Sequence, residues 1–182
     1  MNHSFDERQR VGDIFQTNIS AAKQTFNYCN SSGYRNFCAL STIAFTHPGV
    51  PLDTLLQHIN TMSGDDHGFT VSNTYQIALR LRTLNGQVVS HEECKKNDLN
   101  DDLFRYICRD NVRSVWFSIS RPREDGHLFG AIPLTDDSYC VWDTASSNDL
   151  DSKWSVLSTS EIVERLIFYH TAYKKIGFYV FR

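Results

Sequence analysis

Apolar residues recur at intervals of three or four along the first half of the chain, the spacing of helices that bury one face. The first stripe runs from Val11 to Phe26 and is broken by the turn-forming residues Asn30-Ser31-Ser32-Gly33. The second begins near Cys38 and stops before His47-Pro48-Gly49, because proline ends a helix. Helices are predicted over 11–26, 38–45, 52–62 and 75–81, with loops at 30–33, 47–49 and 64–68.

In the second half of the chain the period changes to two, which is typical of strands. Residues 115–120 alternate between two faces, and the turn residues 135–138 join two further apolar runs into a hairpin. Ser158 and Glu161 have the spacing of a capping box, which predicts that a helix begins there. Strands are predicted over 87–90, 115–120, 127–134, 139–142 and 178–181, helices over 98–109 and 158–169, and a loop over 144–155.

Helices thus come first and antiparallel strands second, which predicts an α+β fold with a helical half packed against a β-sheet half. A chain of 182 residues fits one domain, 1–182, with its own core. Residues 1–28 form an N-terminal helical extension in this interpretation. The sequence leaves open whether this extension binds a partner or completes the core.

Composition narrows the classes of function. The net charge of -3 argues against a nucleic-acid partner, and no apolar run approaches the roughly 20 residues of a membrane span. Five irregularly spaced cysteines and a polar N-terminus are typical of free thiols in a reducing compartment. We therefore expect a cytoplasmic monomer without a cofactor or metal, in the cytoplasm of a host cell if the protein is a secreted effector.

Three residue types in a particular order suggest chemistry. Cys38 lies at a predicted helix N-terminus, where the helix dipole favours a thiolate and free N–H groups can hold an oxyanion. His127 begins one strand of the predicted hairpin and Asp143 follows the other, so the two should be cross-strand neighbours. The order fits a cysteine nucleophile, an imidazole base and a carboxylate that orients the base.

Each of these residues also has an ordinary structural interpretation. Cys38 could be a small buried core residue, His127 a loop histidine without a task, and Asp143 a cap for the loop that begins at Thr144. The other four cysteines lie in poorer contexts for catalysis, and Cys94 with the nearby His91 supplies too few ligands for zinc. The pairing of His127 with Asp143 gives the catalytic interpretation its weight.

Four stretches resemble the Josephin family of deubiquitinases within the papain-like cysteine peptidases. They are Cys38-Ala39 at a helix start, Asp65-Asp66-His67-Gly68-Phe69 before a helix, His127-Leu128-Phe129 opening a strand, and Trp142-Asp143 closing the next. The resemblance implies a papain-like fold and a Cys38, His127, Asp143 triad. The family commonly has asparagine as its third catalytic residue. It also has an oxyanion-binding glutamine five residues before the nucleophile, where this chain has Gly33, so Asn36 is the expected substitute donor.

The sequence therefore predicts a thiol protease that cleaves isopeptide or peptide bonds of ubiquitin or a ubiquitin-like protein. A second hypothesis keeps the triad but makes the enzyme a glutamine deamidase, a transglutaminase or an amidase. A third hypothesis is a binding module on the same scaffold with an inactive triad, which the missing glutamine favours.

Overall fold

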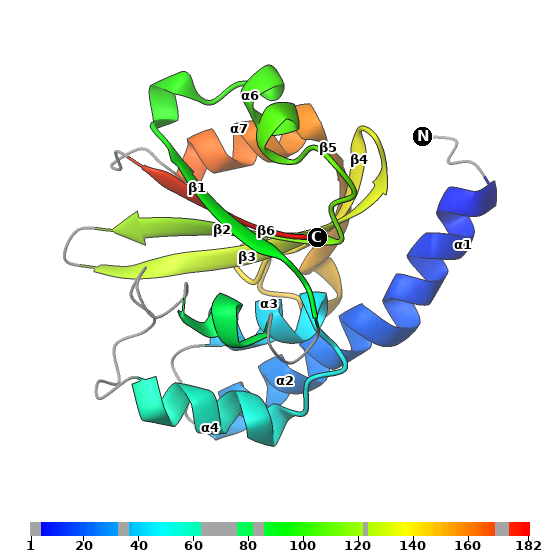
Figure 1. Ribbon diagram of the computed structural model, residues 1–182. Helices are drawn as coiled ribbons and strands as arrows, with labels where there is room; N and C mark the ends of the chain where they lie inside the picture. The colour runs from blue at the N-terminus through cyan, green and yellow to red at the C-terminus, as the bar shows by residue number, and fades with distance from the viewer. Residues whose placement is uncertain (1–4, 33–36, 63–75, 82–85, 122–123, 170–174) are drawn as a thin grey trace.

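Six antiparallel strands form one sheet, in the order β1-β6-β2-β3-β4-β5, between two layers of helices (Figure 1). The computed structural model describes residues 5–32, 37–62, 76–81, 86–121, 124–169 and 175–182. The strands are β1 (Val89–Cys94), β2 (Ser114–Arg121), β3 (Glu124–Thr135), β4 (Ser138–Trp142), β5 (Trp154–Ser158) and β6 (Ile176–Phe181).

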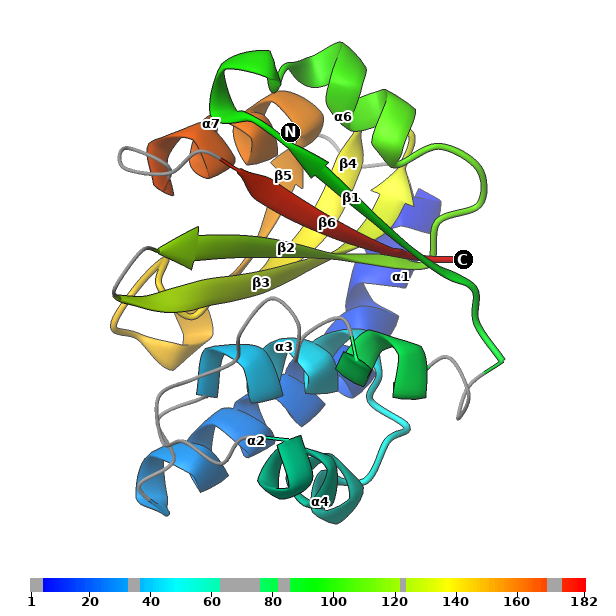
Figure 2. The ribbon, with the colours of Figure 1, turned by 60° about the vertical axis from the view of Figure 1, so that its left-hand side comes forward.

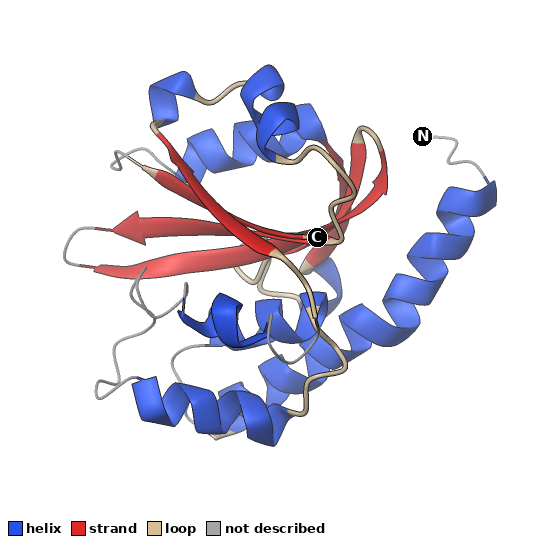
Figure 3. Cartoon of the chain, in the orientation of Figure 1, coloured by secondary structure: helices blue, strands red, loops and turns tan. Residues whose placement is uncertain are grey.

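The helices cover both faces of this sheet. The lower layer holds α3 (Phe37–Thr46), α4 (Leu52–Met62) and the end of a long N-terminal rod, whereas α6 (Asp101–Ile107) and α7 (Thr159–Tyr169) lie on the upper face (Figure 2). The rod consists of α1 (Phe5–Ile14), the π-helical turn η1 (Phe15–Ile19) and α2 (Ser20–Ser31), which follow one another without a break (Figure 3). Short 3₁₀ turns occupy Lys96–Asp98 and Leu150–Ser152, and 76–81 is helical.

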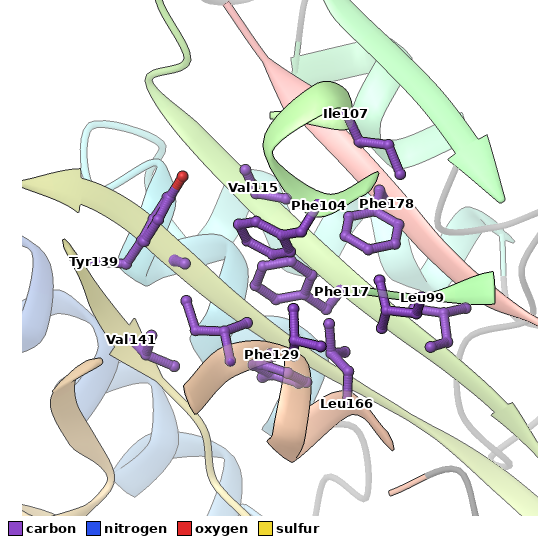
Figure 4. Packing of buried hydrophobic residues seen from close by; sticks show 14 of the residues in the cluster. Leu99, Phe104, Ile107, Val115, Phe117, Phe129, Tyr139, Val141, Leu166 and Phe178 are labelled. Atoms are coloured by element: carbon purple, nitrogen blue, oxygen red, sulfur yellow. The ribbon is translucent and has the colours of Figure 1, made fainter. Parts of the chain in front are cut away.

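The upper core is an aromatic cluster between the sheet and the pair α6 and α7 (Figure 4). Phe104 of α6 lies 5.8 Å from Phe117 and 6.0 Å from Phe178, ring centre to ring centre. Phe117 in turn lies 4.9 Å from Phe129. Leu166 of α7 is fully buried in the same cluster. The lower core is formed by Leu40, Ile43, Leu55, Ala78, Trp116, Tyr179 and their neighbours.

The expected α+β fold, with helices packed against an antiparallel sheet, is therefore confirmed, and the sheet is covered by helices on its second face as well. Trp116 and Phe117 are neighbours that point to opposite faces, and both are fully buried. Every residue of β6 is buried as well. A sheet whose central strands are apolar on both sides must be covered on both sides, and α6 and α7 supply the second layer.

Several predicted boundaries also change. The first strand lies at 89–94 instead of 87–90, and the helix expected over 98–109 is shortened because the Asn100 side chain caps it by accepting from the Leu103 amide at 2.9 Å. Part of the predicted loop 144–155 and the residues after it form β5, which pairs with β4. The capping box is confirmed, since Ser158 N–H donates to Glu161 Oε2 at 2.7 Å and Glu161 N–H donates to Ser158 Oγ at 3.2 Å.

The N-terminal rod contributes to the core. Ile14, Ile19 and Ala22 are buried against Phe45 and Trp142. Phe15, which belongs to the predicted apolar stripe, is instead 45% exposed. The π-helical turn explains the difference, because it places residues five apart, such as Ile14 and Ile19, on one face. Within the described residues, no helix combines the length and apolar character that a membrane crossing requires.

Candidate active site

Hydroxyl groups of α3 attach this helix to the sheet. The indole N–H of Trp142, at the end of β4, donates to Ser41 Oγ at 3.1 Å in a buried position. The next residue, Thr42, donates from Oγ1 to the backbone carbonyl of Leu128 in β3 at 3.2 Å. Directional bonds to two different strands fix both the depth and the rotation of α3.

A third hydroxyl bond and a close contact hold the other end of the helix. The indole N–H of Trp116 donates to Thr46 Oγ1 at 2.7 Å. Gly130 lies beneath Thr42 and Thr46, and a Cβ atom at this position would stand 3.0 Å from Thr42 Cγ2 and 3.2 Å from Thr46 Cγ2. The absence of a side chain at Gly130 thus allows α3 to lie directly on β3.

This packing determines where Cys38 lies. Cys38 is one helical turn before Thr42 and therefore lies on the same face of α3. Thr42 contacts Leu128, the residue after His127, so this face of α3 lies against the strand that carries His127. Its side chain is partly exposed. As the second residue of a ten-residue helix, Cys38 lies where backbone N–H groups have no intrahelical acceptor and the helix dipole favours an anion.

His127 lies in β3 with its side chain only 11% exposed. Its Nε2 atom is 2.7 Å from Oδ1 of Asp143. Its ring packs against Phe129 at 5.9 Å and edge-on against Tyr169 at 5.4 Å. Since Nε2 is used by Asp143, Nδ1 is the nitrogen left for the thiol of Cys38, whose hydrogen bond to His127 contributes to the imidazole's pKa.

His127 and Asp143 are cross-strand neighbours, as expected, and they lie on a diagonal of the strand ladder. Gly130 pairs with Trp142, so the residue opposite Asp143 would be Phe129, and His127 is its diagonal neighbour on the same face. An irregularity between Pro133 and Thr135 shifts the hairpin and sets this offset. Asp143 itself comes directly after β4.

Asp143 is fully buried and accepts four hydrogen bonds. Oδ1 receives His127 at 2.7 Å and the backbone N–H of Ala145 at 3.0 Å. Oδ2 receives the Tyr169 hydroxyl at 2.6 Å and Nη1 of Arg165 at 3.4 Å. All four partners are donors, so the position suits a carboxylate and would oppose the N–H₂ group of an amide.

The two groups shift each other's protonation. Burial alone would raise the pKa of Asp143, but hydrogen bonds from His127, Tyr169 and Ala145 and the charge of His127 lower it below its usual value. Burial lowers the pKa of His127, yet Asp143 and Cys38 outweigh burial and raise it from 6.5 to about 9. At neutral pH His127 is therefore an imidazolium paired with the Asp143 carboxylate.

The segment after Asp143 is held by Lys153, whose side chain is buried. The Asp143 amide donates to the Lys153 carbonyl at 2.8 Å. The Lys153 ammonium donates to the carbonyls of Thr144 at 2.8 Å and Ser147 at 2.5 Å. These bonds fix the segment that follows Asp143 and so help to hold Asp143 in position.

The structure brings together three of the four predicted site residues: Cys38, His127 and Asp143. The fourth, Asn36, lies outside the described residues, as do Gly33 and the stretch 65–69. The other four cysteines have thiols whose pKa is raised by burial, which disfavours the nucleophilic thiolate. The pKa is about 11 for Cys29 and Cys94 and about 12 for Cys108 and Cys140.

Arg165 and Tyr169 were not predicted as site residues from the sequence. Tyr169 belongs to the apolar stripe of its helix, which accounts for the burial of its ring but not for the contact of its hydroxyl with Asp143. The signal that could have found the pair is a phenol and a guanidinium four residues apart, which places both on one helix face.

No protein-family model matches this chain, and no curated protein matches it either. The chemistry of the site is therefore the basis for assigning a function.

Proposed function

We propose that this protein is a papain-like cysteine hydrolase in which Cys38 is the nucleophile, His127 the proton carrier and Asp143 the residue that orients His127. The observation that carries the proposal is the hydrogen bond between His127 Nε2 and Asp143 Oδ1 at 2.7 Å, with the Cys38 side chain interacting with the same imidazole. The three groups come from three separate parts of the chain: α3, β3 and the segment after β4.

The raised pKa of His127 defines the first step. Cys38 loses its proton to solvent, and the resulting thiolate is stabilised by the imidazolium of His127. The thiolate attacks the carbonyl carbon of an amide and forms a tetrahedral intermediate. His127 then gives its proton to the departing amine, the C–N bond breaks and a thioester remains on Cys38. In the second half, His127 takes a proton from water, the resulting hydroxide cleaves the thioester, and the acid product leaves.

The negative oxygen of each tetrahedral intermediate needs donors. The backbone N–H of Cys38 lies in the first turn of α3, where the dipole also favours negative charge. Asn36 remains our proposed side-chain donor. A single donor of this kind is worth about 3 kcal/mol of transition-state stabilisation.

The proposed substrate is an isopeptide or peptide bond at the C-terminus of ubiquitin or a ubiquitin-like protein. This part rests on the Josephin resemblance around Cys38, His127 and Trp142-Asp143. A ubiquitin probe with an electrophilic C-terminus should label the wild-type protein and leave Cys38→Ala unlabelled. The matched control is Cys94→Ala, which removes a partly buried thiol of β1 and should label normally.

Three results would each redirect the assignment. Labelling that persists in Cys38→Ala would exclude Cys38 as the nucleophile. A one-dalton gain on a substrate glutamine, measured by mass spectrometry, would indicate a deamidase instead of a protease. Alkylation of Cys38 by iodoacetamide that is no faster than that of Cys94 would favour an inactive binding module.

A further inference from the structure

We propose that Tyr169 and Arg165 of α7 are positioning residues, which hold the Asp143 carboxylate in the orientation that presents Oδ1 to His127. The proposal deepens the proposed function and rests on it for its catalytic meaning. It adds a third layer to the site: α3 supplies the thiol, the sheet supplies imidazole and carboxylate, and α7 fixes the carboxylate.

The first argument is the division of labour between the two oxygens of Asp143. Tyr169 at 2.6 Å and Arg165 at 3.4 Å both contact Oδ2, whereas His127 contacts Oδ1. A carboxylate held from one oxygen only could rotate about its terminal bond. Donors on both oxygens, two of them from one helix, fix the plane in which His127 must lie.

The second argument is that Tyr169 contacts both members of the pair. Its hydroxyl donates to Asp143, and its ring packs edge-on against the His127 ring at 5.4 Å and 71°. The same ring also packs against Phe129 at 5.8 Å. One side chain therefore sets the position of the acid and forms a wall for the imidazole.

The third argument is the rigidity of α7. Its N-terminus is closed by the capping box of Ser158 and Glu161, and its inner face buries Ile162 and Leu166 completely in the upper core. The hydroxyl of Ser160 also donates to Asp101 at the start of α6. A helix anchored in this way can place a hydroxyl reproducibly at the site.

The pair also adjusts charge. The ionisable groups around the His127–Asp143 pair are Cys38 from α3, Arg165 and Tyr169 from α7, and Lys153 from the segment after β4. The hydroxyl of Tyr169 and the guanidinium of Arg165 stabilise the negative charge of Asp143. Removing either one should strengthen the interaction of Asp143 with His127 and raise the pH at which His127 loses its proton.

The decisive variant is Tyr169→Phe, which keeps the ring and removes the hydroxyl. We expect kcat for a fluorogenic ubiquitin substrate to fall about tenfold with little change in KM, because a ground-state contact to substrate is not involved. The His127 imidazole signals, followed by NMR, should titrate several tenths of a pH unit higher. The control is Tyr106→Phe, which removes the hydroxyl of an exposed tyrosine on α6.

Arg165→Gln provides the second test if Tyr169→Phe fails to fold, since it removes the guanidinium from a partly exposed position and leaves Tyr169 unchanged. It should shift the His127 titration in the same direction. Wild-type titration and wild-type kcat in either folded variant would overturn the proposal. If the wild-type protein does not react with the ubiquitin probe, the proposed function fails, while the NMR titration still decides whether α7 positions Asp143.

Discussion

The two faces of the sheet are packed in different ways. On the upper face, Phe104, Phe117, Phe129 and Phe178 form an aromatic cluster held by burial and ring contacts. On the lower face, apolar packing is combined with directional bonds from α3 to Trp116, Leu128 and Trp142. Burial stabilises without fixing direction, whereas hydrogen bonds fix a helix to one register.

This difference matters because the candidate site takes groups from both layers and from the sheet between them. Cys38 comes from the lower layer, and His127 and Asp143 contact Tyr169 of the upper layer. The thiol and the imidazole can therefore meet only if both layers hold their positions relative to the sheet. Substitutions in the aromatic cluster of the upper core should mainly lower the free energy of unfolding. Substitutions beneath α3 should mainly slow the reaction of Cys38.

Among the variants that test this comparison, Asp143→Asn should have the largest effect on activity. The amide lacks the negative charge, and its N–H₂ group would replace one of the two oxygens and face the donors bound there, so we expect kcat/KM to fall on the order of a hundredfold or more. The titration of His127 should also move down from about 9, because Asp143 is its principal partner. Asp151→Asn, an exposed carboxylate on the same segment, is the control. Full activity in Asp143→Asn would contradict the role given to the carboxylate.

Phe117→Ala tests the upper layer. Phe117 is fully buried between rings of α6 and β6, so its truncation should reduce the free energy of unfolding by about 3–5 kcal/mol, measured by urea titration. The folded fraction should still react with the ubiquitin probe at close to the wild-type rate. A site that loses reactivity more than stability would show that the upper core also sets the geometry of the thiol.

Gly130→Ala tests the lower layer. The added methyl group meets side chains of Thr42 and Thr46 at 3.0 and 3.2 Å, so these side chains, which attach α3 to the sheet, must give way by a few tenths of an ångström. We expect a stability loss of about 1–3 kcal/mol together with slower labelling of Cys38. Gly49→Ala is the matched control because a Cβ atom there meets nothing within 4 Å. Unchanged labelling in Gly130→Ala would mean that the close approach of α3 does not set the position of the thiol.

The mildest test uses pH. Activity should fall to half as the pH rises to about 9, where His127 loses its proton. The same group contributes stability that is fully present below its ordinary pKa of 6.5 and is lost as the pH rises through about 9. The difference in free energy of unfolding between wild type and His127→Gln should therefore shrink over this interval. A constant difference would contradict the charged state of His127.

Helices and the hairpin were predictable where local signals are strong. Pro48 and Gly49 mark the end of α3, and Asp136-Asp137 forms the hairpin turn, so Cys38 and His127 were assigned to the correct elements. The diagonal offset of Asp143 was not predictable, because it depends on an irregularity between Pro133 and Thr135. Strand periodicity specifies the face of a residue but not a shift of the ladder.

Other features depend on distant contacts. The hydroxyls of Ser41, Thr42 and Thr46 look like minor polar residues in an apolar helix, and their partners lie 70 to 101 residues away. β5 escaped prediction because its five residues are all only partly buried, which leaves a weak alternation. Its pairing with β4 supplies the stability that its local sequence lacks.

The π-helical turn at Phe15–Ile19 has a consequence for how the N-terminal rod accommodates an inserted or deleted residue. This turn holds a residue more than an α-helical turn needs, and Ile14 and Ile19 share a face only because of it. Removal of one residue from this turn would leave the two isoleucines four positions apart, a spacing that an ordinary α-helix also places on one face. The π-helical turn therefore takes up one extra residue within the rod, and Ile14 keeps its place against Phe45 and Trp142 with or without it.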